Sequence, residues 1–149
     1  MNGTILVPVD GSAFSRKAAK EAAKFAQRTG STLVLFYAAP DYRSFLSEVF
    51  APPGRLPSLR EKARRAMESE GEAVLAAAAK AAAMKNSKVV KHLVMSDTPY
   101  EAIISAAKKF KCDLIVMPSR GRHRVSGVLL GSETQKVLTH SPVPVLVVR

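Results

Sequence analysis

The stretch "DLIVMPSRGRHRVSGVLLGSETQKVLTH", residues 113–140, decides the fold prediction. It begins with a short apolar run over residues 113–117, which is typical of a strand buried on both faces. It ends with residues 133–140, whose pattern predicts a helix. The loop between them carries three arginines, one histidine and three glycines, and it closes on Gly131-Ser132. A buried strand that leads through such a loop into a helix indicates a parallel α/β sheet with a ligand site at this loop.

The rest of the chain repeats this alternation of strand and helix. Apolar runs predict strands over residues 4–10, 31–39, 88–95, 113–117 and 143–149. The helix patterns between them run from Ser12 or Ser15 to Gly30, from 59 to about 84, from 98 to 111 and from 133 to 140. The alternation predicts an α/β fold in which a five-stranded parallel sheet has helices on both faces.

Local signals mark helix starts and one long connection. A Thr98-x-x-Glu101 capping box opens the helix after the third strand, and a second box begins at Ser132. Residues 40–58 hold four prolines and a glycine, which predicts a long loop with a short helix around Phe45–Val49. A connection of this length is expected to serve as a flap or a contact surface.

Composition narrows the class of protein. With 149 residues, of which 47% are hydrophobic and 23% charged, the chain is expected to form one domain over residues 1–149. No apolar run reaches the roughly 18 residues that span a bilayer, and the start of the chain lacks a signal-peptide pattern. Cys112 is the single cysteine, which excludes an internal disulfide and favours the cytoplasm. The net charge of +11 favours anionic partners.

Special residues gather at the carboxyl ends of the first and fourth predicted strands. These ends read "VPVDGS", residues 7–12, and the loop that follows residue 117. If the two strands flank the point where the sheet reverses its winding, the two loops face each other and a ligand lies between them. The helix that starts at Gly131-Ser132 offers free N–H groups and partial positive charge to an anion. The loop also carries cationic side chains within reach of a phosphate chain, namely Arg120, Arg122, His123 and Arg124.

These residues resemble a known family over essentially the whole chain. "ILVPVDGS", residues 5–12, and "DLIVMPSRGR…LLGSETQKVLTHSPVPVLVV", residues 113–148, resemble the universal stress protein family. Its ATP-binding members carry Gly-x2-Gly-x9-Gly-Ser/Thr, and this chain has Pro118-x2-Gly121-x9-Gly131-Ser132. The resemblance implies a sheet with the strand order 3-2-1-4-5. It also implies a homodimer that pairs the last strand, residues 143–149, with its twofold mate.

The resemblance further implies a site for ATP or a related adenine nucleotide, with or without magnesium. Asp10 would lie near the adenosine, Gly121 at the ribose–phosphate turn, and Gly131 with Ser132 around the phosphates. Backbone positions flanking the base would be Pro8, Val9 and Ala38. The full set of expected binding residues is Pro8, Val9, Asp10, Gly11, Ser12, Ala38, Pro118, Ser119, Arg120, Gly121, Arg122, Gly131, Ser132 and Glu133.

Other readings of these residues stay open at this point. Asp10 and Ser132 can act as helix caps, and the loop arginines can be solvated surface charge. No phosphate-loop motif, dinucleotide fingerprint, catalytic triad or metal-ligand spacing is present, so the sequence favours binding over catalysis. The main alternative is a nucleotide-free dimeric interaction scaffold. Nucleic acid is the least favoured partner, because no aromatic residues interleave the basic loop.

Overall fold

The computed structural model describes residues 3–43, 54–83, 85, 88–122, 127 and 129–149. The predicted short helix around Phe45–Val49 lies outside the described residues, as do His123 and Arg124. The elements in chain order are β1 (Thr4–Pro8), α1 (Ala13–Thr29), β2 (Thr32–Ala39), α3 (Leu56–Ala82), β3 (Val89–Met95), α4 (Pro99–Lys109), β4 (Leu114–Pro118), α5 (Ser132–His140) and β5 (Val145–Val148).

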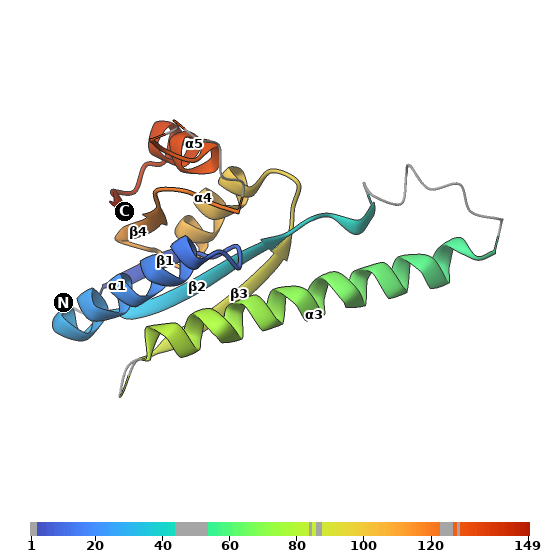
Figure 1. Ribbon diagram of the computed structural model, residues 1–149, viewed down its shortest axis with the longest axis horizontal. Coiled ribbons are helices and arrows are strands. Elements are labelled where there is room, and N and C mark those ends of the chain that lie inside the picture. The colour runs from blue at the N-terminus through green and yellow to red at the C-terminus, as the bar shows by residue number, and fades with distance from the viewer. Residues whose placement is uncertain (1–2, 44–53, 84, 86–87, 123–126, 128) are drawn as a thin grey trace.

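The predicted sheet is confirmed. All five strands are parallel, and their order is β3-β2-β1-β4-β5. Helices α1 and α3 pack on one face and α4 and α5 on the other, each over its own cluster of buried apolar side chains. Figure 1 shows the long α3 running along β2 and β3 and continuing past the ends of these strands. No helix of the described ranges is long and apolar enough to cross a bilayer.

Helix α1 shows how the sequence sets its own boundaries. Ser12, and not Ser15, is the N-cap, because its side chain accepts a hydrogen bond from the Ser15 N–H at 3.1 Å. Gly30 ends the helix in the left-handed conformation at φ 69°, which glycine adopts without steric cost. The buried face of α1 is a stripe of small residues that lets the helix lie close to the sheet, namely Ala18, Ala19, Ala22, Ala23 and Ala26.

Helix α3 packs against the sheet through a glycine, Gly71. A Cβ placed on Gly71 would lie 2.7 Å from the Tyr37 ring and would also clash with Leu93. The helix backbone therefore packs directly on β2 and β3 at this position. The sequence places a glycine in mid-helix, where it costs about 1 kcal/mol of helix propensity, and the close approach explains why it stands there.

The structure corrects several predicted boundaries. Helix α3 begins at Leu56 and not at residue 59, because Pro57 fits the first turn of a helix, where no N–H is needed. The long connection after β2 therefore ends at residue 55. Strand β1 ends at Pro8 rather than residue 10, and β5 begins at Val145 rather than residue 143.

The two predicted capping boxes are also wrong in detail. Thr98 precedes α4 but makes no side-chain cap, since its N–H donates to Ser96 Oγ while Glu101 accepts from the Tyr100 hydroxyl. At the start of α5 the N-cap is Gly131, and Ser132 is already the first helical residue. The Ser132 hydroxyl is thus not used for capping.

Candidate functional site

The two central strands separate at their carboxyl ends. β1 and β4 pair only through Ile5 and Leu6, opposite Leu114 and Ile115. A cleft of about 350 Å³ lies beyond this point, where ligands of doubly wound sheets bind. Its lining consists of Pro8, Val9, Asp10, Phe36, Tyr37, Ala38, Pro40, Pro99, Ile103, Met117, Pro118, Gly121, Arg122, Gly131, Ser132, Glu133 and Thr134.

Most of the binding residues expected from the sequence line this cleft, and four do not. Ser12 caps α1, and the neighbouring Gly11 turns the chain at φ 84°. Ser119 is buried, and its backbone joins β5 to the start of α5. Arg120 belongs to the same loop as Arg122 but lies outside the lining. The prediction that the loops after β1 and β4 face each other is confirmed. The sequence did not show which residues of these loops face the cleft and which support the loops from behind.

Sequence reasoning missed the apolar lining residues other than those the family resemblance implied. Phe36, Ile103 and Met117 come from β2, α4 and β4, and each belongs to an ordinary core pattern. Pro40 and Pro99 follow the carboxyl end of β2 and open α4. Their position at the same edge of the sheet as Asp10 is the one signal that could have found them.

Asp10 joins the two facing loops. Its Oδ1 accepts a hydrogen bond from the Ser12 N–H at 2.9 Å, and its Oδ2 accepts from the Arg122 N–H at 3.0 Å. A Cβ on Gly121 would lie 2.9 Å from Asp10 Oδ2, so only glycine allows this approach. The carboxylate therefore fixes the distance between the loops after β1 and β4 while it faces the cleft.

The start of α5 presents free backbone donors to the cleft. Gly131 is held by its N–H, which donates to the Ser119 carbonyl at 2.7 Å, and the Thr134 hydroxyl donates to the Pro118 carbonyl at 2.8 Å. The N–H groups of Ser132, Glu133 and Thr134 donate to no acceptor in the described part of the chain. These donors and the positive end of the helix dipole form a site suited to an anion.

Pro118 takes the place of a glycine in the family pattern without breaking the sheet. The N–H groups of Ile115 and Ser119 donate to Pro144 and Val148 on the β5 side, at 2.9 and 2.8 Å. Because alternate residues of a parallel strand face opposite neighbours, position 118 faces β1. The pairing of β1 with β4 has already ended there, so proline removes no ladder hydrogen bond.

The charged side chains of the cleft are few. Arg122 is the single cationic side chain among the described lining residues, beside the carboxylates of Asp10 and Glu133. Glu133 Oε2 accepts from the Tyr100 N–H at 2.9 Å and so caps the first turn of α4. Glu133 Oε1 lies 3.2 Å from Lys136 Nζ. The Glu133 carboxylate thus holds α4 against α5.

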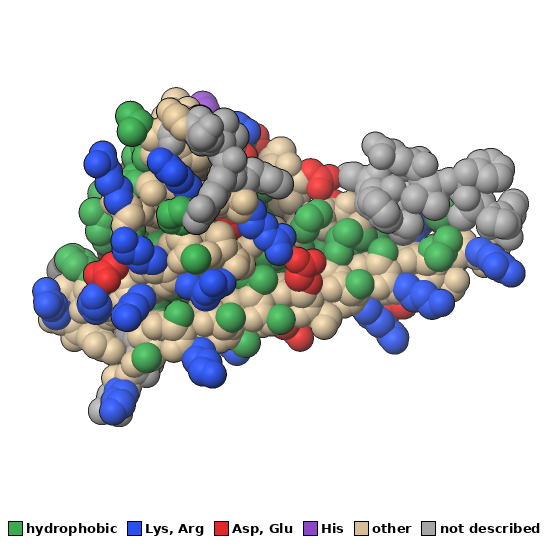
Figure 2. Space-filling view, viewed as in Figure 1, with side chains coloured by type: hydrophobic (Ala, Val, Ile, Leu, Met, Phe, Trp, Pro, Cys, Tyr) green, Lys and Arg blue, Asp and Glu red, His purple; other side chains and the backbone are tan. Residues whose placement is uncertain are grey.

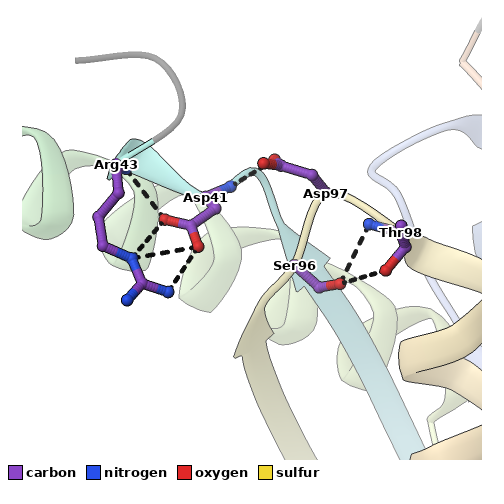
Figure 3. A network of polar contacts seen from close by, with 5 residues as sticks. All are labelled: Asp41, Arg43, Ser96, Asp97 and Thr98. Carbon is purple, nitrogen blue, oxygen red and sulfur yellow. Dashed lines mark hydrogen bonds and ion pairs between the residues drawn. The ribbon is translucent and has the colours of Figure 1, made fainter. Parts of the chain in front are cut away.

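A polar network supports the apolar edge of the cleft. The Asp41 N–H donates to Asp97 Oδ1 at 2.9 Å, and the Arg43 guanidinium pairs with the Asp41 carboxylate at 2.7 Å. Figure 3 draws both contacts. The Thr98 N–H donates to Ser96 Oγ at 3.1 Å. These contacts join the carboxyl ends of β2 and β3 and fix the chain beside the two prolines of the lining.

Cys112 and His92 lie outside the lining of the cleft. Cys112 is buried, and burial raises the pKa of its thiol to about 11, so the thiolate that a nucleophile needs is scarce near neutral pH. His92 packs against the rings of Phe36 and Phe110. Within the described residues, no three His, Cys, Asp or Glu side chains are grouped so as to hold a metal ion.

Comparison with known proteins identifies the family. The model of the universal stress protein family matches residues 1–149. A universal stress protein of Thermus aquaticus is 36% identical over 146 residues, which are 98% of each chain. The structure of universal stress protein UspA from Lactobacillus plantarum has a TM-score of 0.75 at 28% identity and covers 99% of this chain and 97% of its own. A universal stress protein solved in complex with cAMP shares the fold, with a TM-score of 0.61 at 24% identity and coverage of 99% and 96%. The chain belongs to the universal stress protein family.

Proposed function

We propose that this protein is an adenine-nucleotide-binding regulatory homodimer of the stress response, formed by one domain over residues 1–149. The observation that carries the proposal is the start of α5, where the free N–H groups of residues 132–134 face the cleft that Asp10 and Arg122 border. An anion at this helix end and an aromatic base between Phe36, Ile103 and Met117 would fill the two halves of one cleft.

The family supports the choice of nucleotide. One universal stress protein of the same fold was solved with cAMP, which contains an adenine base and a phosphate. ATP is the ligand that we expect here, as the family pattern at Gly121, Gly131 and Ser132 implies. Magnesium, if it accompanies ATP, would be carried mainly by the phosphates, because Asp10 and Glu133 already accept backbone hydrogen bonds.

We propose binding rather than catalysis. The described lining contains no histidine, lysine or cysteine, and its two carboxylates, Asp10 and Glu133, already accept backbone hydrogen bonds. Neither carboxylate is therefore free to act as a general base on the Ser132 hydroxyl or a bound water. We also propose a cytoplasmic location, since a single buried thiol fits a reducing compartment. Nucleic acid is not expected as a partner, because the Lys and Arg side chains on the face shown in Figure 2 are spread along it rather than gathered into one track.

The dimer is proposed to form through residues 143–149. β5 is an edge strand that pairs with β4 on one side only. Its Leu146 is 46% exposed, and an exposed apolar edge strand promotes pairing with another chain. A nucleotide-free dimeric scaffold is the second candidate, and this same edge is the observation that favours it.

Thermal unfolding with and without ligand tests the proposal. ATP at about a hundred times its dissociation constant adds roughly 2.7 kcal/mol, which for a chain of this size raises Tm by about 5–10 °C. Gly131→Val should abolish the shift, because its side chain would lie between the phosphates and the helix end. A Cβ at Gly131 would make only ordinary contacts, 3.5 Å from Arg120 Cα and Gly121 N. A cooperative unfolding transition without ligand checks that the larger valine side chain is also accommodated. A wild type that shows no shift at millimolar ATP would favour the scaffold.

A further inference from the structure

Arg122 is already occupied by a carboxylate from another element. Its Nη2 lies 3.1 Å from Glu70 Oε1, which belongs to α3. The guanidinium passes beside Gly11, where an added Cβ would lie 3.7 Å from Nη2. The side chain therefore extends from the loop after β4, along the turn after β1, to the long helix. The Arg122 side chain thus lies at one border of the cleft.

Whether a ligand can separate Arg122 from Glu70 depends on the strength of this ion pair. The side chains of Arg122 and Glu70 are 53% and 52% exposed, and exposed pairs contribute little, because water solvates both charges. A charge-assisted hydrogen bond from the same guanidinium to a phosphate is stronger, since the phosphate carries more charge and several acceptor oxygens. A phosphate in the cleft would therefore displace Glu70 from Arg122.

The backbone of Arg122 does not need to move in this exchange. Its N–H stays bound to Asp10 Oδ2 at 3.0 Å, so the guanidinium pivots about a fixed point of the loop. Glu70 makes no other hydrogen bond or ion pair in the described part of the chain, so it has nowhere else to place its charge except in water.

We propose that Glu70 is a specificity-determining residue, an internal competitor that holds Arg122 and is displaced by ligands with a phosphate group. This inference rests on the proposed nucleotide site. Because Arg122 is the single cation of the described lining, Glu70 sets how strongly the cleft favours phosphorylated over unphosphorylated ligands. Adenosine leaves the pair intact, whereas ATP must first break it.

Isothermal titration of ATP and adenosine into the full chain tests this inference. Glu70→Gln keeps the size of the side chain and removes its charge. It should tighten ATP binding up to about fivefold, the upper end for an exposed pair, and leave adenosine unchanged. Arg122→Gln should weaken ATP binding about tenfold or more, and in that background Glu70→Gln should have no further effect.

Glu72→Gln is the matched control, because Glu72 is exposed on the same helix and makes no contact with Arg122. An equal gain from Glu72→Gln and Glu70→Gln would mean that general charge acts rather than the pair, and it would overturn the inference. ATP binding that does not respond to Glu70→Gln would overturn it as well, while leaving the nucleotide site intact. If wild type bound neither ATP nor adenosine, the nucleotide site and this inference would both fail.

Discussion

Gly71→Ala introduces one methyl group where α3 packs directly against β2 and β3. Its Cβ would lie 2.7 and 2.9 Å from two carbons of the Tyr37 ring and would clash with Leu93. Overpacking of this kind costs roughly 1–3 kcal/mol, and the better helix propensity of alanine returns about 1 kcal/mol. We therefore expect a net loss of about 1 kcal/mol, which lowers Tm by about 2–4 °C. Because Tyr37 also lines the cleft, the displaced ring should weaken nucleotide binding too.

Differential scanning calorimetry measures this effect against a matched variant. Ser69→Ala changes an exposed position two residues earlier on α3, so only helix propensity acts there, and Tm should stay equal or rise slightly. The reasoning is refuted if Gly71→Ala raises Tm by as much as its full gain in helix propensity. That result would mean that α3 does not need its close contact with β2 and β3.

Four further predictions concern a helix cap, the edge strand and two titrating groups. Ser12→Ala removes the N-cap of α1 and should lower the free energy of unfolding by about 1 kcal/mol. Urea unfolding measures this loss, and an unchanged midpoint would contradict the prediction. Leu146→Lys, at the exposed position of β5, should convert the proposed dimer to a monomer in light scattering, and a persistent dimer would place the interface elsewhere. Cys112 should react with a disulfide reagent at pH 8 only after unfolding, because burial raises its pKa to about 11. Burial lowers the pKa of His92, so the unfolded chain binds a proton at this imidazole more readily than the folded chain does. The free energy of unfolding should therefore fall as pH drops below about 6.5. His92→Gln should reduce that fall.

The sheet was predictable because each strand and helix carries its own local signal. The apolar runs, the alanine stripe of α1 and the Gly30 stop all agree with the alternation of strand and helix that a parallel sheet requires. The strand order came from the family resemblance, since periodicity alone does not order strands. Helix starts were less predictable, because the same residues can cap a helix or bond elsewhere, as Thr98 does.

The cleft was predictable in its polar half and at the four apolar positions that the family resemblance supplied, namely Pro8, Val9, Ala38 and Pro118. Asp10, Gly121 and Gly131 stand out in the sequence because they lie in the loops that follow two buried strands, at the edge where parallel sheets bind ligands. Phe36 and Ile103 look like any buried side chain, and only the folded sheet shows that they border a cavity. Arg122 and Glu70 are 52 residues apart in the sequence, so no local pattern could have revealed their contact.

The central claim is that a nucleotide phosphate binds at the start of α5, and amide NMR during an ATP titration tests it most directly. The account predicts saturable shifts that are largest at the N–H groups of Ser132, Glu133 and Thr134, with a smaller response at Arg122. Adenosine should leave the α5 amides almost unchanged and shift residues around Phe36 instead. Shifts confined to the exposed lysines of α1, or no saturable shift at millimolar ATP, would contradict the claim.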